Sequence, residues 1–196
     1  INSNGKHLSP QEVRQAGNTT VFSNLVREIS AEIRGDVSSE VLPLTGMPEI
    51  SIDSRKIPLG YGISADETFW CNQGILRVSH VRDSEDEQLI ADILLSIALK
   101  EPFTATKDNF DDYYQNVKKK LQIETAIATY GRDNIKQDIK LVFDQIKYLT
   151  IFGGSEKNFL RNTLNPNAGS NAAKEPYYTL FMAMYKLLIV EAMEVS

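Results

Sequence analysis

The chain has 196 residues and a mass of 22.0 kDa, with 42% hydrophobic and 24% charged residues, as expected for a soluble globular protein with one sizeable core. Its net charge of −5 and pI of 5.1 argue against an extensive nucleic-acid-binding surface, which usually needs a basic face. The single cysteine, Cys71, excludes an internal disulfide and fits a reducing cytoplasm, and no apolar run reaches the roughly 18 residues of a membrane span.

The chain opens with a turn that leads into a predicted helix start. Residues 2–5 read Asn-Ser-Asn-Gly, a turn sequence in which Gly5 tolerates a positive φ. Ser9, Pro10 and Glu12 then have the spacing of a capping box with proline at the first helical position. A turn followed by a helix N-terminus can hold a phosphate, but the same pattern is also ordinary chain punctuation. Both interpretations are open at this point.

Five residues of this opening, Asn2, Gly5, Leu8, Glu12 and Arg14, have the spacing of a known motif. They resemble the asparagine motif of the ParB/sulfiredoxin-like domain of GmrSD-type restriction and other phage-defence proteins. The resemblance implies a bacterial, cytoplasmic protein in which Asn2 and Gly5 belong to a nucleotide-binding site. It also suggests that Glu12 and Arg14 fix the first helix against a neighbouring domain through a charge pair.

In that family the asparagine works beside an upstream Asp-Gly-Gln-Gln-Arg motif in a site that handles nucleotide and DNA. No Asp-Gly-Gln occurs here, and the chain begins at Ile1. We therefore expect the C-terminal part of a larger protein, with the catalytic half upstream. Residues 1–16 would complete the motif and form the first helix, and residues 17–196 would form a helical domain. The chain itself would hold no catalytic residue and no cofactor, whereas the parent would use a nucleoside triphosphate with magnesium.

An amphipathic helix is predicted over residues 21–34, where apolar residues recur at helical spacing until Gly35. Residues 35–63 are rich in glycine and proline and predict a long irregular insertion, with one short strand near residues 50–53. A second stretch then resembles the middle of the same defence-protein family: Tyr-Gly-Ile at 61–63, Phe-Trp at 69–70 and Gly-Ile-Leu at 74–76. Trp70 is expected to anchor the core or, alternatively, to stack on a base.

Residues 84–100 predict a central helix that starts with a second capping box at Ser84. Its three first-turn acids suit the helix dipole, and we predict no metal site there. A further element begins at residues 108–114, and Lys118, Lys119 and Lys120, the densest positive run in the chain, follow. This run is either a solvated helix face, with Leu121, Ile123 and Ile127 buried beneath it, or a phosphate contact that would be sensitive to salt.

Helices are also expected over residues 133–152, 156–164 and 176–194. Apolar residues cover more than one face of the last helix, so it is either central or packed against a second chain or a missing domain. The sequence contains only two histidines, His7 and His80, and no zinc-ligand spacing, P-loop or nucleophile elbow. These absences leave no recognisable catalytic constellation.

The sequence thus predicts a mainly α fold of six or seven helices with an irregular insertion at 35–63. Our first hypothesis is the helical C-terminal part of a nucleotide-dependent DNA-nicking or restriction protein, which completes or regulates an upstream domain and is inactive alone. Its partners would be that missing domain and DNA. The alternative is a helical interaction module that forms a homodimer through residues 176–194 and has no role with nucleotide. Neither hypothesis involves a membrane.

Overall fold

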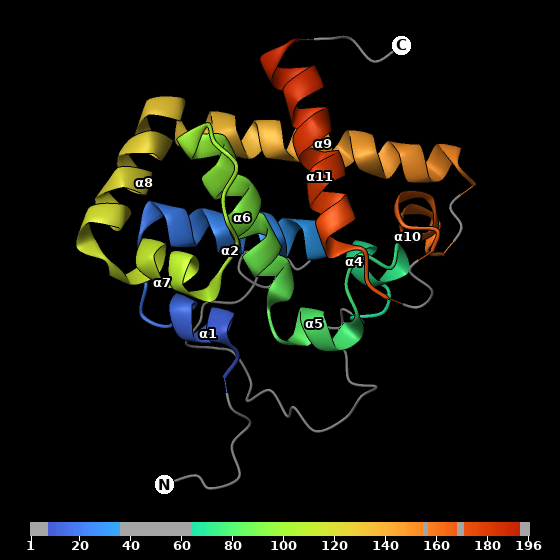
Figure 1. Ribbon diagram of the computed structural model, residues 1–196, viewed down its shortest axis with the longest axis horizontal. Helices are drawn as coiled ribbons and strands as arrows, with labels where there is room; N and C mark the ends of the chain where they lie inside the picture. The colour runs from blue at the N-terminus through green and yellow to red at the C-terminus, as the bar shows by residue number, and fades with distance from the viewer. Residues whose placement is uncertain (1–7, 36–63, 155–156, 168–170, 193–196) are drawn as a thin grey trace, which may run out of the picture.

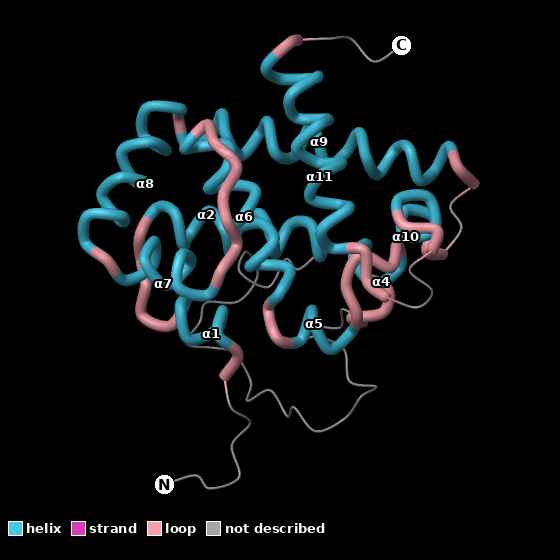
Figure 2. Tube along the Cα trace, viewed as in Figure 1, coloured by secondary structure: helices cyan, strands magenta, loops and turns pink. Residues whose placement is uncertain are grey.

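The computed structural model describes residues 8–35, 64–154, 157–167 and 171–192. This part of the chain is helical and contains no strand, which confirms the predicted mainly α class (Figure 2). The elements, in chain order, are α1 Pro10–Gln15, α2 Val21–Arg34, α4 Phe69–Asn72, α5 Val78–Arg82, α6 Glu85–Leu99, α7 Lys107–Gln115, α8 Val117–Tyr130, α9 Arg132–Phe152, α10 Phe159–Leu164, α11 Lys174–Tyr185 and the π-helix η2 Lys186–Val190.

Helix α6 is the centre of the fold. Every residue from Leu89 to Ala98 is buried, and α6 packs against α1, α2, α5, α8, α9 and α11. All of these residues except Asp92 and Ser96 are apolar, which suits a helix that its neighbours cover on all sides. Figure 1 shows α6 in the middle of the body, with α9 running along the upper edge and α1 and α5 at the lower edge.

An aromatic cluster joins three segments that are distant in sequence. The ring centroid of Phe69 in α4 lies 4.8 Å from that of Phe143 in α9, and Trp70 lies 5.4 Å from Tyr177 in α11 in an edge-to-face arrangement. Trp70 is fully buried, so its ring anchors the core and has no face free for a nucleic-acid base. The cluster holds the α4–α5 segment against the rest of the domain.

Local signals explain where several helices begin and end. The capping box of α1 is present, with Ser9 Oγ accepting from the Glu12 N–H and Glu12 Oε2 accepting from the Ser9 N–H at 2.6 Å. Helix α2 ends at Gly35, which has a φ of 76°. Gly131, with a φ of 93°, separates α8 from α9. These signals act within a few residues, so the sequence alone reveals them.

Some predictions were wrong in detail. Ser84 has a left-handed backbone, φ 58° and ψ 29°, and its side chain makes no cap hydrogen bond, so the predicted second capping box does not form. Leu121 is 67% exposed instead of buried, although Ile123 and Ile127 are buried as expected. The described residues form ten α-helices instead of six or seven, because short helices such as α4 span too few residues to show a helical period.

The last helix is shorter and less enclosed than predicted. Helix α11 ends at Tyr185 and continues as the π-helix η2, and only Tyr177, Phe181 and Tyr185 of α11 are buried hydrophobic residues. Its end projects beyond the body in Figure 1. Among the described helices, none is long and apolar enough to span a bilayer. The predicted insertion and its short strand lie in residues 36–63, outside the described residues.

Candidate functional site

The predicted motif helix α1 is held against the body by polar side chains that are almost completely buried. Arg14 is 2% exposed, and its Nε donates to Asp111 Oδ1 of α7 at 2.7 Å. Its two terminal nitrogens reach Gln88 Oε1 of α6 at 3.4 Å and the Lys107 carbonyl at 3.3 Å. The guanidinium also lies 5.2 Å from the ring centre of Phe110. One arginine therefore joins α1 to both α6 and α7.

Two glutamines complete this contact. Gln11 and Gln15 each donate from Nε2 to the hydroxyl of Tyr114, at 3.0 Å and 3.4 Å. Burial, the largest influence, raises the pKa of Tyr114, so its hydroxyl stays neutral. Together the group forms one buried hydrogen-bonded unit, which we call the polar junction and which consists of Gln11, Arg14, Gln15, Gln88, Asp111 and Tyr114.

The charge on Asp111 is favoured despite its partial burial. Burial by itself disfavours the carboxylate, but hydrogen bonds from Lys107, at 2.7 Å, and from Arg14 outweigh it and lower the pKa of Asp111. The Arg14–Asp111 bond is therefore an ion pair at neutral pH, with a length typical of charge-assisted hydrogen bonds.

The structure assigns local roles to the supporting residues of the motif. Glu12 caps α1, and Arg14 pairs with Asp111 instead of Glu12. These contacts lie within this domain, so the predicted role of Glu12 and Arg14 against a missing domain stays a prediction. Asn2, Gly5 and His7 lie outside the described residues, so the predicted nucleotide contact stays a prediction.

A second buried charge cluster lies at the first turn of α6. Arg34, the last residue of α2, donates from Nη1 to Asp86 Oδ2 at 3.0 Å, and its Nη2 lies 3.7 Å from Glu87 Oε1. Burial raises the pKa of Asp86, and it raises the pKa of Glu87 to about 7. Asp86 and Glu87 thus bind α2, whereas Glu85 lies 3.3 Å from Lys174. No group of three or more potential ligands within the described ranges is arranged to hold a metal ion.

The lysine run at 118–120 does not act as a unit. Lys118 is exposed, whereas the Lys119 ammonium lies 5.2 Å from the ring centre of Tyr113. Lys120 donates to Asn18 Oδ1 at 3.0 Å. The three side chains therefore have different surroundings, and the predicted phosphate contact of Lys118, Lys119 and Lys120 stays a prediction.

An open groove of about 690 Å³ lies along α11 and η2, beside the C-terminal ends of α6 and α8. Its walls are mainly aromatic and aliphatic, and we call it the apolar groove, lined by Ser96, Ile97, Lys100, Glu101, Pro102, Tyr130, Tyr178, Thr179, Met182, Tyr185, Lys186, Ile189 and Val190. The hydroxyls of Tyr130 and Tyr185 are 2.9 Å apart, and the Tyr178 hydroxyl lies 2.7 Å from Ser96 Oγ. The hydroxyls are therefore already hydrogen-bonded within the domain.

Sequence reasoning missed most of the polar junction. Gln88, Asp111 and Tyr114 come from α6 and α7, and no local pattern marks them as partners of α1. One signal was present in the sequence. Arg14 and Gln15 follow Gln11 by three and four residues, so the three side chains share one face of a helix. A polar face opposite an exposed Val13, which is 52% exposed, indicates that α1 packs through hydrogen bonds.

The chain matches no known family model, no curated protein and no solved structure.

Proposed function

We propose that this chain is a helical accessory domain of a nucleotide-dependent DNA-nicking or restriction protein, which positions a nucleotide-binding segment and has no catalytic activity of its own. Its partner is an upstream domain of the same protein, and DNA is the substrate of the assembled enzyme. The nucleotide, with magnesium, binds at the assembled site to which Asn2 and Gly5 contribute.

The observation that supports this proposal is the burial of Arg14. The resemblance to the restriction family includes Arg14, and this residue is 2% exposed and bonded to two helices. A buried, multiply bonded arginine fixes the position of α1 on the body. The segment that carries Asn2 and Gly5 comes directly before α1 in the sequence. The fixed position of α1 therefore sets where that segment joins the domain.

The second resembling stretch supports the same proposal. Helices α4 and α5 follow the Tyr-Gly-Ile sequence, and Trp70, Ile75 and Leu76 of this region are buried in the core. Helix α5 packs on the same central helix as α1, and both lie at the lower edge of the body in Figure 1. Helix α1 and helix α5, which follows the second stretch, are therefore both fixed on α6.

The test is nucleotide-dependent nicking of supercoiled DNA by the natural polypeptide that contains this chain. We expect Asn2→Ala to lower the nicking rate by about tenfold or more, the effect of one lost hydrogen bond to a charged group. Asn4→Ala is the matched control, because Asn4 lies outside the resembling positions. Equal rates for the two variants, or nicking by this chain alone, would overturn the proposal.

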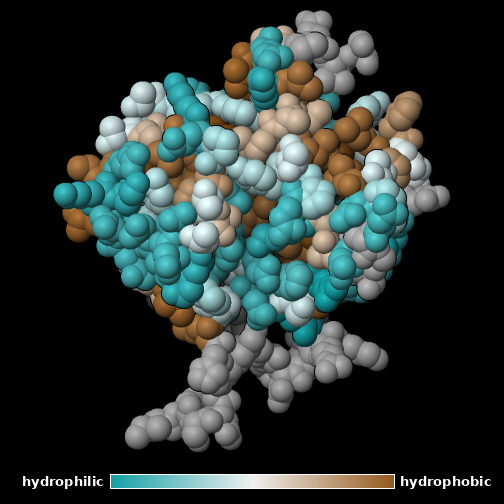
Figure 3. Space-filling model, in the orientation of Figure 1, coloured by the Kyte–Doolittle hydropathy of each residue, from teal (hydrophilic) through white to brown (hydrophobic). Residues whose placement is uncertain are grey.

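A second candidate function, self-association through α11 and η2, is favoured by the apolar groove. Val190, which is 64% exposed, lies in the wall of the groove, and Leu187, which is 41% exposed, lies on the same helical segment outside the lining. The projecting end of this segment therefore carries exposed apolar side chains beside an apolar cavity (Figure 3). In a two-fold dimer the projecting side chains of each copy can enter the groove of the other.

The charges around the groove are suited to pairing with a second copy. Its rim carries Lys100 and Glu101, and Lys186 lies 3.6 Å from Glu191 with 70% of its side chain exposed. Exposed ion pairs of this kind contribute little to stability, so they can exchange for equivalent pairs across a two-fold axis. The occupant that fits this surface is therefore another copy of the chain.

Sedimentation velocity over an approximately hundredfold range of protein concentration tests the second candidate. We expect a monomer–dimer equilibrium that Val190→Asp weakens by about tenfold or more, since it places a charge in an apolar contact. Val117→Asp on α8 is the control, because Val117 is 79% exposed and lies outside the groove. A monomer at all concentrations excludes this function.

A further inference from the structure

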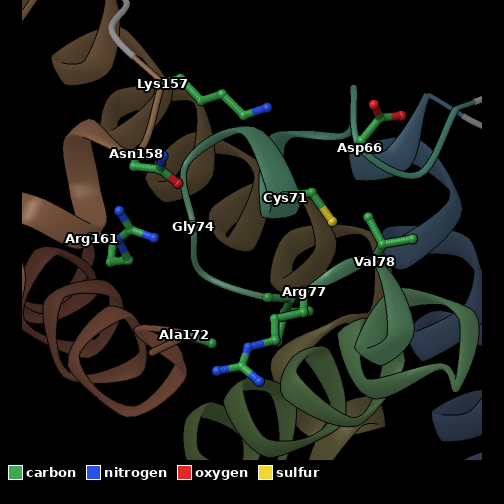
Figure 4. A pocket seen from close by; sticks show the side chains of 10 residues that line it. Asp66, Cys71, Gly74, Arg77, Val78, Lys157, Asn158, Arg161 and Ala172 are labelled. Atoms are coloured by element: carbon green, nitrogen blue, oxygen red, sulfur yellow. The ribbon is translucent and has the colours of Figure 1, made fainter. Parts of the chain in front are cut away.

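A smaller pocket of about 250 Å³ lies between the α4–α5 segment, α10 and the chain entering α11, separate from the apolar groove and the polar junction. Figure 4 shows three cationic side chains around it: Arg77, Lys157 and Arg161. They come from three segments, namely the residue before α5, the chain that enters α10, and α10 itself. We call this site the basic pocket.

Backbone hydrogen bonds build the wall of the basic pocket. The carbonyls of Asn72 and Gln73 accept from the N–H groups of Asn158, at 2.7 Å, and Arg161, at 3.2 Å. The Gly74 carbonyl accepts from the Ala173 N–H at 3.1 Å. Three consecutive residues thus bind both α10 and the start of α11, and the pocket is held in shape without help from a ligand.

Gly74 is needed for this close approach. Its φ is +68°, and an added Cβ would lie 2.7 Å from Asn158 Oδ1 and 3.0 Å from Arg161 Cβ. A side chain at this position would therefore strain the backbone and push α10 away. The glycine lets the chain pass directly against the residues that line the pocket.

The pocket has a surplus of positive charge. Within the part of the chain that the structure describes, no salt bridge involves Arg77, Lys157 or Arg161, and the two arginines contact only amide oxygens of nearby asparagines. One carboxylate, Asp66, also lines the pocket. Its pKa is lowered first by a hydrogen bond from Ser64 and also by the charge of Lys157, so it stays ionised.

The remaining reactive group in the pocket is Cys71. Burial raises the pKa of its thiol, so the sulfur is protonated at neutral pH and is a poor nucleophile. The residues in the pocket are therefore suited to binding an anion and lack an activated group that would transform it.

We propose that the basic pocket binds a phosphate group. The charged ends of Arg77, Lys157 and Arg161 point in different directions in Figure 4, and these long side chains turn toward the phosphate when it binds. Guanidinium groups match phosphate oxygens in charge and geometry. At roughly 30 Å³ per water, the pocket holds the volume of about eight water molecules, enough for a phosphate or pyrophosphate. It is smaller than the roughly 300–1,000 Å³ of sites that enclose whole ligands, so the rest of a nucleotide or of a nucleic-acid strand stays outside.

This inference stands apart from the proposed function, because the pocket shares no residue with the motif of Asn2, Glu12 and Arg14. The phosphate has two possible sources, a free nucleotide or the backbone of a nucleic acid. Binding to the isolated chain can be measured without any nicking assay, so failure of one proposal leaves the other intact.

The test is calorimetric titration of the chain with pyrophosphate, with adenosine triphosphate and with a single-stranded oligonucleotide that lacks a terminal phosphate. We expect pyrophosphate to bind, and the double variant Arg77→Gln/Arg161→Gln to weaken its affinity about tenfold or more, through the loss of two charge-assisted contacts. Lys147→Gln is the matched control, since it removes an exposed positive charge from α9, outside the pocket.

Asp66→Asn gives an independent readout, because it removes the one negative charge in the pocket at an exposed position and leaves the arginines in place. We expect it to tighten pyrophosphate binding about two- to fivefold. Tighter binding of the triphosphate than of pyrophosphate identifies a nucleotide as the source. Oligonucleotide binding whose salt dependence falls in the double variant identifies a nucleic-acid backbone. No binding of pyrophosphate, or equal binding by wild type and double variant, overturns the proposal.

Discussion

The two ends of α6 lie in opposite chemical environments. At its N-terminal end, Gln88 and Glu87 face Arg14 and Arg34, and these charged and polar groups are bonded to one another within the domain. At its C-terminal end, Ser96, Ile97 and Lys100 line the apolar groove, which no described segment covers. A buried polar group needs partners with defined geometry, whereas an apolar wall accepts any matching surface. The first end therefore fixes the internal arrangement of the domain, and the second leaves an apolar wall that no described segment covers.

The largest effect is expected from breaking the polar junction. Arg14→Ala should lower the free energy of unfolding by about 2–4 kcal/mol, because it leaves Asp111 and Gln88 without their buried partner. Lys107→Ala removes the other cation that binds Asp111 at 2.7 Å, but Lys107 is exposed, so we expect a much smaller loss of stability. Urea unfolding of both variants measures the difference. Similar losses would mean that burial of the arginine is not what stabilises the contact.

The buried carboxyls predict that stability changes with pH. Burial raises the pKa of Glu87 from 4.5 to about 7 and that of Asp92 from 3.8 to about 7. Between the ordinary pKa values of these carboxyls and about pH 7, the folded state binds more protons than the unfolded state. The free energy of unfolding therefore falls as the pH rises through this range, and it levels off above it. We expect a decrease on the order of 1–3 kcal/mol.

Urea unfolding at about pH 5.5 and about pH 8 measures this decrease. Glu32 and Asp111 have lowered pKa values and stay ionised at both pH values, so they do not contribute to the change. Glu87→Gln and Asp92→Asn should each flatten the dependence, because an amide does not titrate. A wild-type stability that rises with pH over this interval would contradict the assignment.

A smaller effect is expected at the start of α1. Ser9→Ala removes the side-chain acceptor of the Glu12 N–H and should cost about 1 kcal/mol. Since Glu12 also accepts from the Ser9 N–H, the double variant Ser9→Ala/Glu12→Ala should lose less than the sum of the two single variants. Strict additivity in a double-mutant cycle would show that the two hydrogen bonds of the capping box act independently.

The smallest effect on stability is expected at the apolar end. Leu187→Asp on η2 changes a side chain that is 41% exposed, so the free energy of unfolding of the monomer should change by less than about 0.5 kcal/mol. Denaturation at the lowest practicable protein concentration, where any self-association is minimal, checks this. A large loss of monomer stability would place Leu187 with the core, and the contrast between the two ends of α6 would no longer hold.

The sequence by itself determined the parts of the fold that depend on neighbouring residues. The helical periods of residues 21–34 and 133–152, the capping box of Ser9 and Glu12, and the helix end at Gly35 were all predictable. These features rest on hydrogen bonds and side-chain spacing within one or two turns of helix. Where the local signal misled, as at Ser84, a left-handed backbone conformation kept a suitable side chain from capping the helix.

Only the tertiary structure decided which of these helices meet, and therefore where the candidate sites lie. Arg14 finds Asp111 across 97 positions of sequence, and Arg77 and Arg161 line one pocket because Gly74 lets α10 approach the α4–α5 segment. Likewise, the apolar groove arises because α11 crosses the body and leaves its end uncovered. Such contacts depend on the packing of the whole chain around α6, and no short stretch of sequence contains the information that specifies them.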